Sequence, residues 1–295
     1  MRFLVLGAAA GGGLPQWNCG CTNCVDARRG AIPPSSQSSL AVSMSDGNWS
    51  ILNASPDIRA QLAANPQMHP CALRHTPIRS VLLTNGDIDH IAGLLSLREQ
   101  TPFELLATTE IHDILVQNPV FRALSRDKVV RRAIVPDADF ALQDGLTARL
   151  FPVPGKVPLF MEGETVQTDL IGGQTVGVRL TGGGRTACYI PGCADVTDAL
   201  LRELADVDLL FFDGTVWDDD EMIRSGTGAK TGRRMGHVPI SGEDGSVARL
   251  AGVAARKVFI HINNTNPILQ PGSPERAEVL AAGWQVAQDG MEITA

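Results

Sequence analysis

The sequence has few aromatic residues and no long hydrophobic run. Aromatic side chains make up 5% of its 295 residues, and Tyr189 is the single tyrosine. A membrane-spanning helix needs about 20 consecutive apolar residues, and no segment of the sequence supplies them. The apolar start, Met1–Gly7, is too short for a signal peptide and is predicted to form a strand. These absences argue against a membrane protein and lead us to expect a cytoplasmic one.

The sequence also lacks an excess of positive charge. Its formal net charge is −7. Because nucleic-acid-binding proteins concentrate lysine and arginine on one surface, we expect a small-molecule partner and no nucleic acid. The apolar content of 44% is typical of a globular chain. The length suffices for one sizeable core, so a single domain over residues 1–295 is predicted. A homodimer is an assembly that the sequence leaves open.

Three of the six cysteines lie within six residues, at Cys19, Cys21 and Cys24. Without an export signal, a disulfide framework is not expected, and clustered thiols in a cytosolic chain indicate a metal site. A closed tetrahedral zinc site needs a fourth ligand. The candidates are His261 and a group in the turn 263–266. The alternative, three unconnected thiols, would expose the chain to oxidation.

Short apolar segments of strand type precede segments with helical periodicity. The predicted strands are 2–7, 39–44, 49–53, 78–83, 104–108, 147–153, 176–180, 186–190, 207–212 and 257–262. The predicted helices are 57–65, 88–100, 109–117, 119–126, 195–205, 242–255 and 274–282. Early strands follow one another, with a hairpin loop at 45–48, and later strands alternate with helices. This mixture predicts two β-sheets packed face to face with helices outside.

Residues 83–90, Leu-Thr-Asn-Gly-Asp-Ile-Asp-His, connect a predicted strand to a predicted helix. Asp89 and His90 are adjacent at the start of that helix and can both reach one ion if the backbone turns sharply. Histidine is the commonest metal ligand, and a carboxylate widens the choice of metal. The alternative is a helix cap, in which Asp87 or Asp89 accepts backbone N–H groups and His90 is merely exposed.

Three further polar residues follow apolar strands or a glycine-rich loop. His261 lies at the end of the predicted strand 257–262, and Asp213 directly follows the predicted strand 207–212. His237 follows residues 225–236, which are rich in glycine and arginine and are predicted to form a loop over a site. His261 is interpreted as a metal ligand and His237 as a ligand, proton donor or anion contact. The alternatives are a surface histidine, a turn aspartate and an ordinary loop histidine.

The chain resembles the metallo-β-lactamase superfamily over nearly its whole length, and within it the branch that serves pyrroloquinoline quinone (PQQ) synthesis. The segments that carry the resemblance are 4–18, 19–24, 53–57, 84–94, 212–215, 235–237 and 261–267. The resemblance implies an α/β (α+β) fold, the αββα sandwich, with two mixed β-sheets flanked by helices. It places a metal site in a cleft along the edge that the sheets share.

The chain departs from the superfamily's metal-binding pattern. Asn85 and Asp87 replace the first two histidines of the motif His-x-His-x-Asp-His, whereas Asp89 and His90 keep its last two positions. Residues 154–156, Pro-Gly-Lys, stand where hydrolases carry another histidine, and the bridging aspartate expected near Cys193 is absent. The resemblance therefore implies that one metal site is lost. Asp89, His90 and His261 form the other, and this ligand set also suits a mononuclear Fe(II) oxygenase.

The resemblance implies an enzyme of PQQ biosynthesis that hydroxylates a precursor derived from cross-linked Glu and Tyr. One active-site divalent metal is expected, Fe²⁺, together with a structural Zn²⁺ on the thiolates. Asp87, Asp213 and His237 are the predicted catalytic residues, with Asp213 as a supporting group or a further ligand. Arg233 and Arg234 are predicted to pair with substrate carboxylates. Two alternatives remain: a non-enzymatic carrier of PQQ or its precursor, and a metal-dependent phosphodiesterase.

Overall fold

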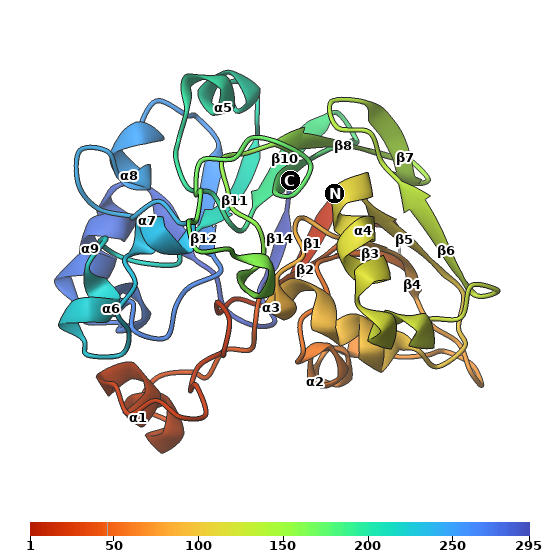
Figure 1. The fold of residues 1–295 in the computed structure, drawn as a ribbon, viewed down its shortest axis with the longest axis horizontal. Helices are drawn as coiled ribbons and strands as arrows, with labels where there is room; N and C mark the ends of the chain where they lie inside the picture. The colour runs from red at the N-terminus through yellow and green to blue at the C-terminus, as the bar shows by residue number, and fades with distance from the viewer. Residues whose placement is uncertain (46) are drawn as a thin grey trace.

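The computed structural model describes residues 1–45 and 47–295 and shows two β-sheets packed face to face (Figure 1). The first sheet has the order β14-β1-β2-β3-β4-β5-β6. Its strands are β1 (Arg2–Gly7), β2 (Ser39–Ser45), β3 (Asn48–Leu52), β4 (Ile78–Leu82), β5 (Phe103–Ala107), β6 (Val129–Ala133) and β14 (Glu292–Thr294). Pairing is antiparallel from β14 to β3 and parallel from β3 to β6.

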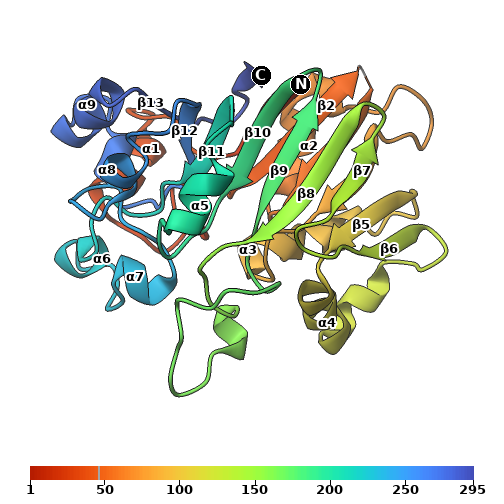
Figure 2. The same ribbon diagram turned by 90° about the horizontal axis from the view of Figure 1, so that it is seen from above.

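The second sheet has the order β13-β12-β11-β10-β9-β8-β7 (Figure 2). Its strands are β7 (Asp139–Gln143), β8 (Leu146–Pro152), β9 (Val176–Gly182), β10 (Arg185–Ile190), β11 (Leu209–Asp213), β12 (Arg256–Ile260) and β13 (Trp284–Val286). Pairing is antiparallel from β7 to β10 and parallel from β10 to β13. Each sheet therefore has a parallel half, and ligand sites commonly lie at the carboxyl ends of such strands.

Helices surround the two sheets, on their outer faces and at their edges (Figure 1 and Figure 2). They are α1 (Thr22–Arg29), α2 (Ile58–Ala64), α3 (Ile88–Ile91), α4 (Thr109–Gln117), α5 (Asp198–Glu203), α6 (Glu221–Arg224), α7 (Gly232–Met235), α8 (Ser246–Arg249) and α9 (Pro274–Ala281). Short 3₁₀ helices span Pro66–Met68, Ala92–Leu97, Pro119–Ala123, Leu159–Met161 and Pro267–Leu269. None of the helices placed by the structure is long and apolar enough to cross a membrane.

Three apolar layers hold this arrangement together. Between the sheets, the rings of Phe3 and Phe211 lie 5.3 Å apart, and both side chains are buried. Outside the first sheet, Ile111 of α4 packs with strand residues, and outside the second sheet Val279 of α9 does so. Each fully buried side chain of this size contributes roughly 1.5–3 kcal/mol relative to exposure. The predicted αββα sandwich is confirmed.

The structure confirms the predicted strands within a few residues and adds elements that the sequence did not predict. The strands that were not predicted are β6, β7, β13 and β14, of which β13 and β14 have three residues each, too short for a clear alternating pattern. Helix α1 lacks an apolar stripe and is fixed instead by the burial of Cys24 and Ala27. Of the predicted hairpin loop 45–48, Asp46 lies outside the described residues, while Ser45 pairs with Asn48.

Two predicted helices are much shorter than expected. The segment 88–100 forms α3 followed by a 3₁₀ helix from Ala92, and 242–255 is helical only over α8. Gly93 explains the first difference. Its N–H donates to the carbonyl of Ala54, and a Cβ at this position would lie 2.0 Å from the carbonyl oxygen of Ser55. The chain after His90 is therefore fixed against the loop that follows β3.

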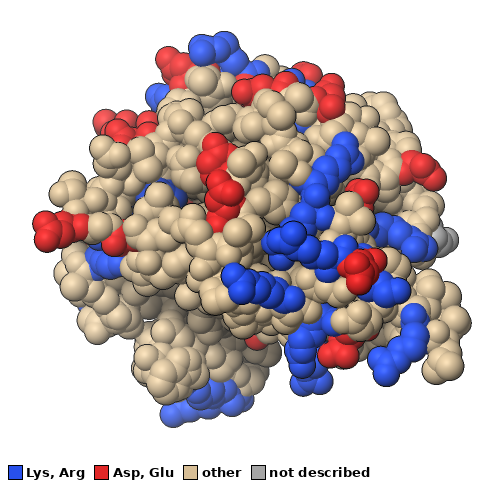
Figure 3. Space-filling model, turned by 45° about the vertical axis from the view of Figure 1, so that its right-hand side comes forward, with Lys and Arg blue, Asp and Glu red and all other residues tan. Residues whose placement is uncertain are grey.

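Charge is distributed unevenly over the surface. Basic side chains gather on the side that carries α4 and β6 (Figure 3). There, Arg122, Arg126 and Arg131 line a cavity of about 370 Å³. The chain is thus locally basic on one side although its net charge is negative.

Candidate metal centre and active site

A group of two histidines and one aspartate lies where the two sheets meet. Asp89 and His90 belong to α3, which follows β4 of the first sheet, whereas His261 directly follows β12 of the second sheet. His261 has a φ of 59°, in the left-handed region that non-glycine residues seldom adopt. Such backbone conformations persist mainly at functional sites, where the surrounding structure enforces them.

The three side chains are close enough to share one ion. One ligand atom from each of Asp89, His90 and His261 lies within 4.8 Å of the other two. Oδ2 of Asp89 is 3.0 Å from Nε2 of His261 and 4.0 Å from Nε2 of His90. The structure therefore brings together the three residues that the sequence proposed as ligands.

The hydrogen bonds around His90 fit a metal ligand. Its Nδ1 donates to Oδ1 of Asn85 at 2.7 Å, so the lone pair of the neutral ring is on Nε2. Nε2 is buried and has no hydrogen-bond partner among the described residues. Buried polar atoms are seldom left without a partner, and a metal ion would supply one. A hydrogen bond from the second ring nitrogen is the usual support of a metal-binding histidine.

His261 has equivalent support. The hydroxyl of Thr215 donates to Oδ1 of Asp213 at 2.6 Å and accepts from Nδ1 of His261 at 2.8 Å. This chain of hydrogen bonds leaves Nε2 of His261 directed at Asp89. Because the ring orientation is fixed by groups behind it, the ligand atom is in place before any ion binds.

The charges of the site favour a cation between these ligands. Burial lowers the pKa of His90 to about 4, so its ring is neutral. Burial opposes ionisation of Asp89, but the neighbouring His90 and the hydrogen bond from His261 lower its pKa below the usual range. Burial likewise opposes protonation of His261, yet the hydrogen bond and charge of Asp89 raise its pKa. Without a metal ion, His261 thus shares a proton with the carboxylate of Asp89 through Nε2, at the place where a cation would bind.

Asp213 and His237 form a second pair behind the first group. Asp213 is fully buried, and its Oδ2 accepts from Nδ1 of His237 at 2.7 Å and from the N–H of Cys193 at 2.9 Å. Its Oδ1 accepts from both the N–H and the hydroxyl of Thr215. Asp213, His237 and His261 are also close enough for an ion. Because four donors occupy the carboxylate, we assign Asp213 to positioning His237 rather than to metal binding.

The metal-capable group opens into a cavity of about 270 Å³. Besides Asp89, His90 and His261, its wall includes Asp87, His237, Leu159 and Met235. Asp87, one of the predicted catalytic residues, therefore lines this cavity. Burial and the charge of Asp89 raise the pKa of the Asp87 carboxyl. His237 keeps Nε2 as the ring nitrogen not used by Asp213.

The predicted pair Arg233 and Arg234 does not line the cavity. Arg233 is exposed, and Arg234 donates to Glu162 at 3.1 Å. Two lysines that were not among the predicted site residues, Lys156 and Lys230, line it instead. Lys156 stands in the segment where a histidine ligand was expected, and Lys230 lies in the predicted loop over the site. The sequence therefore indicated that both positions are close to the site, although it did not identify the lysines.

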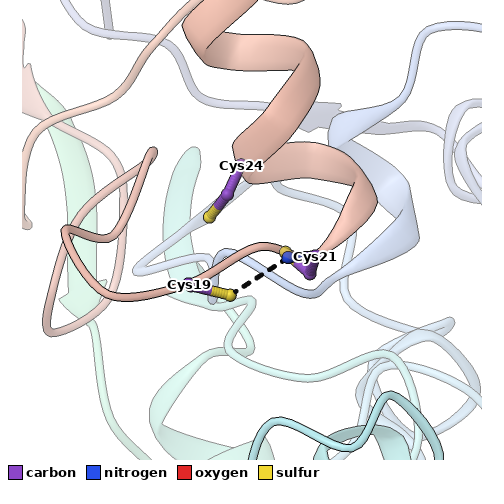
Figure 4. A group of neighbouring side chains, drawn as sticks. All are labelled: Cys19, Cys21 and Cys24. Atoms are coloured by element: carbon purple, nitrogen blue, oxygen red, sulfur yellow. Dashed lines mark hydrogen bonds between the residues drawn. The ribbon is translucent and has the colours of Figure 1, made fainter.

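The thiols of Cys19, Cys21 and Cys24 lie within 4.8 Å of one another and turn toward a common centre (Figure 4). Nδ2 of Asn264 lies 3.2, 3.4 and 3.4 Å from the three sulfurs, within hydrogen-bond distance of each, and has two N–H groups to donate. Hydrogen bonds outweigh burial in lowering the pKa of Cys19, whereas burial raises that of Cys24 to about 11. The turn at Asn264 therefore adjoins the thiols, and His261, the other candidate for a fourth ligand, faces Asp89 instead.

The family model and the relatives found by comparison with known proteins point to the same superfamily. A family model described as the Beta-lactamase superfamily domain matches residues 48–262. The coenzyme PQQ synthesis protein B of Ruegeria pomeroyi is 68% identical over 293 residues, which cover 99% of each chain. The protein of the same name from Rhizobium meliloti is 54% identical over 296 residues, 99% of this chain and 97% of that one.

Solved structures share the fold along the whole chain. The crystal structure of Zn²⁺-bound PqqB from Methylobacterium extorquens has a TM-score of 0.98 and 52% identity and covers all of both chains. A diphosphatase from the PhnP family has a TM-score of 0.71 and 22% identity over 100% of this chain and 97% of that one. At that identity the likeness extends to the fold alone. The resemblance seen in the sequence is confirmed.

Proposed function

The chain belongs to the beta-lactamase superfamily and, within it, to the coenzyme PQQ synthesis protein B family, and on this basis we propose that it acts in PQQ synthesis as a metal-dependent hydroxylase. The substrate is the precursor derived from cross-linked Glu and Tyr. The observation that carries the proposal is the buried Nε2 of His90, which has no partner in the described structure and lies beside Asp89 and His261.

The ligand set supports one active-site ion. Asn85 and Asp87 occupy two positions that carry histidines in the superfamily motif, and Oδ1 of Asn85 is already engaged by His90. Asp89, His90 and His261 thus provide two imidazoles and one carboxylate, which leave coordination positions open and suit Fe(II). A structural Zn²⁺ on Cys19, Cys21 and Cys24 is the second metal of the proposal.

An Fe(II) ion bound there would supply the O₂ chemistry of hydroxylation. In this reaction one oxygen atom of O₂ enters the aromatic ring and the other leaves as water. An external reductant supplies two electrons, and two protons are consumed. The chain's own groups move protons. Nε2 of His237, held by Asp213, can take or return a proton at the substrate's phenol oxygen. The carboxyl of Asp87, with its raised pKa, is a second carrier in the same cavity.

The test is direct hydroxylation. The protein is loaded with Fe(II) under anaerobic conditions and given the cross-linked diamino acid, a reductant and O₂. Mass spectrometry is expected to show the gain of one oxygen atom. His90→Ala is expected to abolish the gain, and His75→Ala, which removes an imidazole outside the cavity, to keep it.

Other outcomes favour the alternatives. Absence of the gain with wild-type protein, or an unchanged gain in His90→Ala, would falsify the proposal. Tight calorimetric binding of PQQ without turnover under any metal would indicate a carrier. Two catalytic ions per chain, in addition to the zinc on the thiols, would indicate a hydrolase.

A further inference from the structure

Three cations converge on one buried carboxylate beside the cavity. Oε1 of Glu162 lies 2.9 Å from Nζ of Lys156, and Oε2 lies 3.1 Å from Nη2 of Arg234 and 3.8 Å from Nζ of Lys230. The side chain of Glu162 is 8% exposed. Burial opposes its ionisation, but the hydrogen bond from Arg234 and the charge of Lys156 lower its pKa to about 2. This cluster brings residues 155–170 against the segment that contains α7.

The positive charge of the cluster exceeds its negative charge. Lys156, Lys230 and Arg234 bring three charges, and Glu162 neutralises one. An ammonium group has three donors. Nζ of Lys156 forms an ion pair with Glu162 and donates one hydrogen bond, at 3.3 Å, to the carbonyl of Val157, whereas Lys230 lies beyond hydrogen-bond distance of Glu162. Donors therefore remain for another anion.

The two lysines, and not Arg234 or Glu162, line the cavity that contains Asp89, His90 and His261. Lys156 is fixed there because its aliphatic stem lies against the backbone of Gly236, where an added Cβ would be 3.2 Å from its Cγ. Its side chain is 13% exposed, and that of Lys230 is 42% exposed. Charge pairs are screened less in a partly buried wall than on an open surface.

We propose that Lys156 and Lys230 form a carboxylate-binding subsite in the wall of this cavity, and that Glu162 positions their ammonium groups. This subsite rests on the proposed function and deepens it. It names the substrate group, a carboxylate, by which a small aromatic substrate is held while its ring faces the metal ligands. A carboxylate is the chemistry favoured, since the same lysines already accommodate the carboxylate of Glu162.

Direct binding tests the subsite without turnover. The full-length zinc-loaded protein is titrated calorimetrically with 3-(4-hydroxyphenyl)propionate and with its uncharged amide. Wild-type protein is expected to prefer the carboxylate by about tenfold, as one charge-assisted contact allows. Lys156→Met and Lys230→Met are each expected to reduce that preference, and the double variant to abolish it.

Arg233→Met is the matched control, because it removes the same charge from an exposed neighbouring position. It is expected to keep the preference; an equal loss would show a long-range charge effect and overturn the proposal. Three other results would also overturn the proposal. They are equal or undetectable binding of both ligands to wild-type protein, a preference for the carboxylate that is unchanged in the double variant, and lysine-dependent binding of phenyl phosphate that is tighter than that of the carboxylate. Unfolding temperature and zinc content verify that each variant is folded. Because no hydroxylation is measured, failure here is distinguishable from failure of the proposed function.

Discussion

Nδ1 of His90 donates to Oδ1 of Asn85 at 2.7 Å, so a residue at a position that bears a metal ligand in the superfamily motif here supports His90, a proposed ligand. The same Oδ1 accepts the N–H of Asp87 at 3.1 Å and thereby shapes the turn before α3. In the proposed metal site, the amide oxygen of Asn85 thus holds both the ring of His90 and the backbone that leads to it.

Asn85→Ala is expected to weaken active-site metal binding. Without the acceptor, the ring of His90 is free to rotate, and loss of such a supporting group typically costs about 10–100-fold in metal affinity. Competition with a chromophoric chelator measures the affinity. Asn85→Asp, which keeps an acceptor oxygen, is expected to retain binding. Equal affinities for wild-type protein and Asn85→Ala would contradict this role.

Cys24→Ser is expected to release one zinc per chain and to lower the unfolding temperature. Cys24 is a buried residue of α1, and a structural zinc site contributes directly to folding. For a chain of this size, the unfolding temperature is expected to fall by on the order of 5–10 °C. Metal analysis and thermal unfolding make the measurement. Cys71→Ser, which removes an exposed thiol, is the control; identical zinc content in both variants would disprove the assignment.

Gly93→Ala is expected to destabilise the fold by about 2–4 kcal/mol, because the new methyl group meets the backbone oxygens of Ser55 and Ala54. The shift of the segment after His90 is also expected to reduce active-site metal affinity. Gly252→Ala is the matched control, since an added Cβ meets nothing within 4 Å there. Urea unfolding of both variants decides the matter, and equal stabilities would show that Gly93 is not tightly packed.

Glu221→Gln is expected to alter the pH dependence of stability. Burial raises the pKa of Glu221 to about 7 from an ordinary 4.5, against the hydrogen bonds from Thr265 and Trp217. Between these values the folded chain retains a proton that the unfolded chain releases. The stabilisation is therefore complete below pH 4.5 and is lost as pH rises through 7. The total is on the order of 3 kcal/mol.

Glutamine mimics the protonated acid and does not titrate. The stability of Glu221→Gln relative to wild-type protein is accordingly expected to increase when the pH is raised from 5 to 8. Urea unfolding at both pH values measures this difference. Glu278→Gln, at an exposed position of α9, controls for the loss of one charge. A stability difference between Glu221→Gln and wild type that is the same at both pH values would refute the argument.

Local features of the site could be predicted because they depend on neighbours in the chain. Asp89 and His90 are adjacent, and the three cysteines lie within one turn-rich loop. Apolar periodicity likewise located strands, since alternation records which face of a strand is buried. The sequence could not show that Arg233 and Arg234 lie outside the cavity wall, because a helix as short as α7 has no apolar period from which the direction of a side chain follows.

The sequence by itself determined the buried strands of the sandwich, the thiol cluster and the Asp-His pair. Only the tertiary structure decided that His261 meets Asp89 from the opposite sheet, that Asn264 lies on thiols about 240 positions earlier, and that Lys156 and Lys230 face one cavity. The physical reason is that short-range patterns encode burial of each segment, whereas contacts between distant segments depend on how two complete sheets pack.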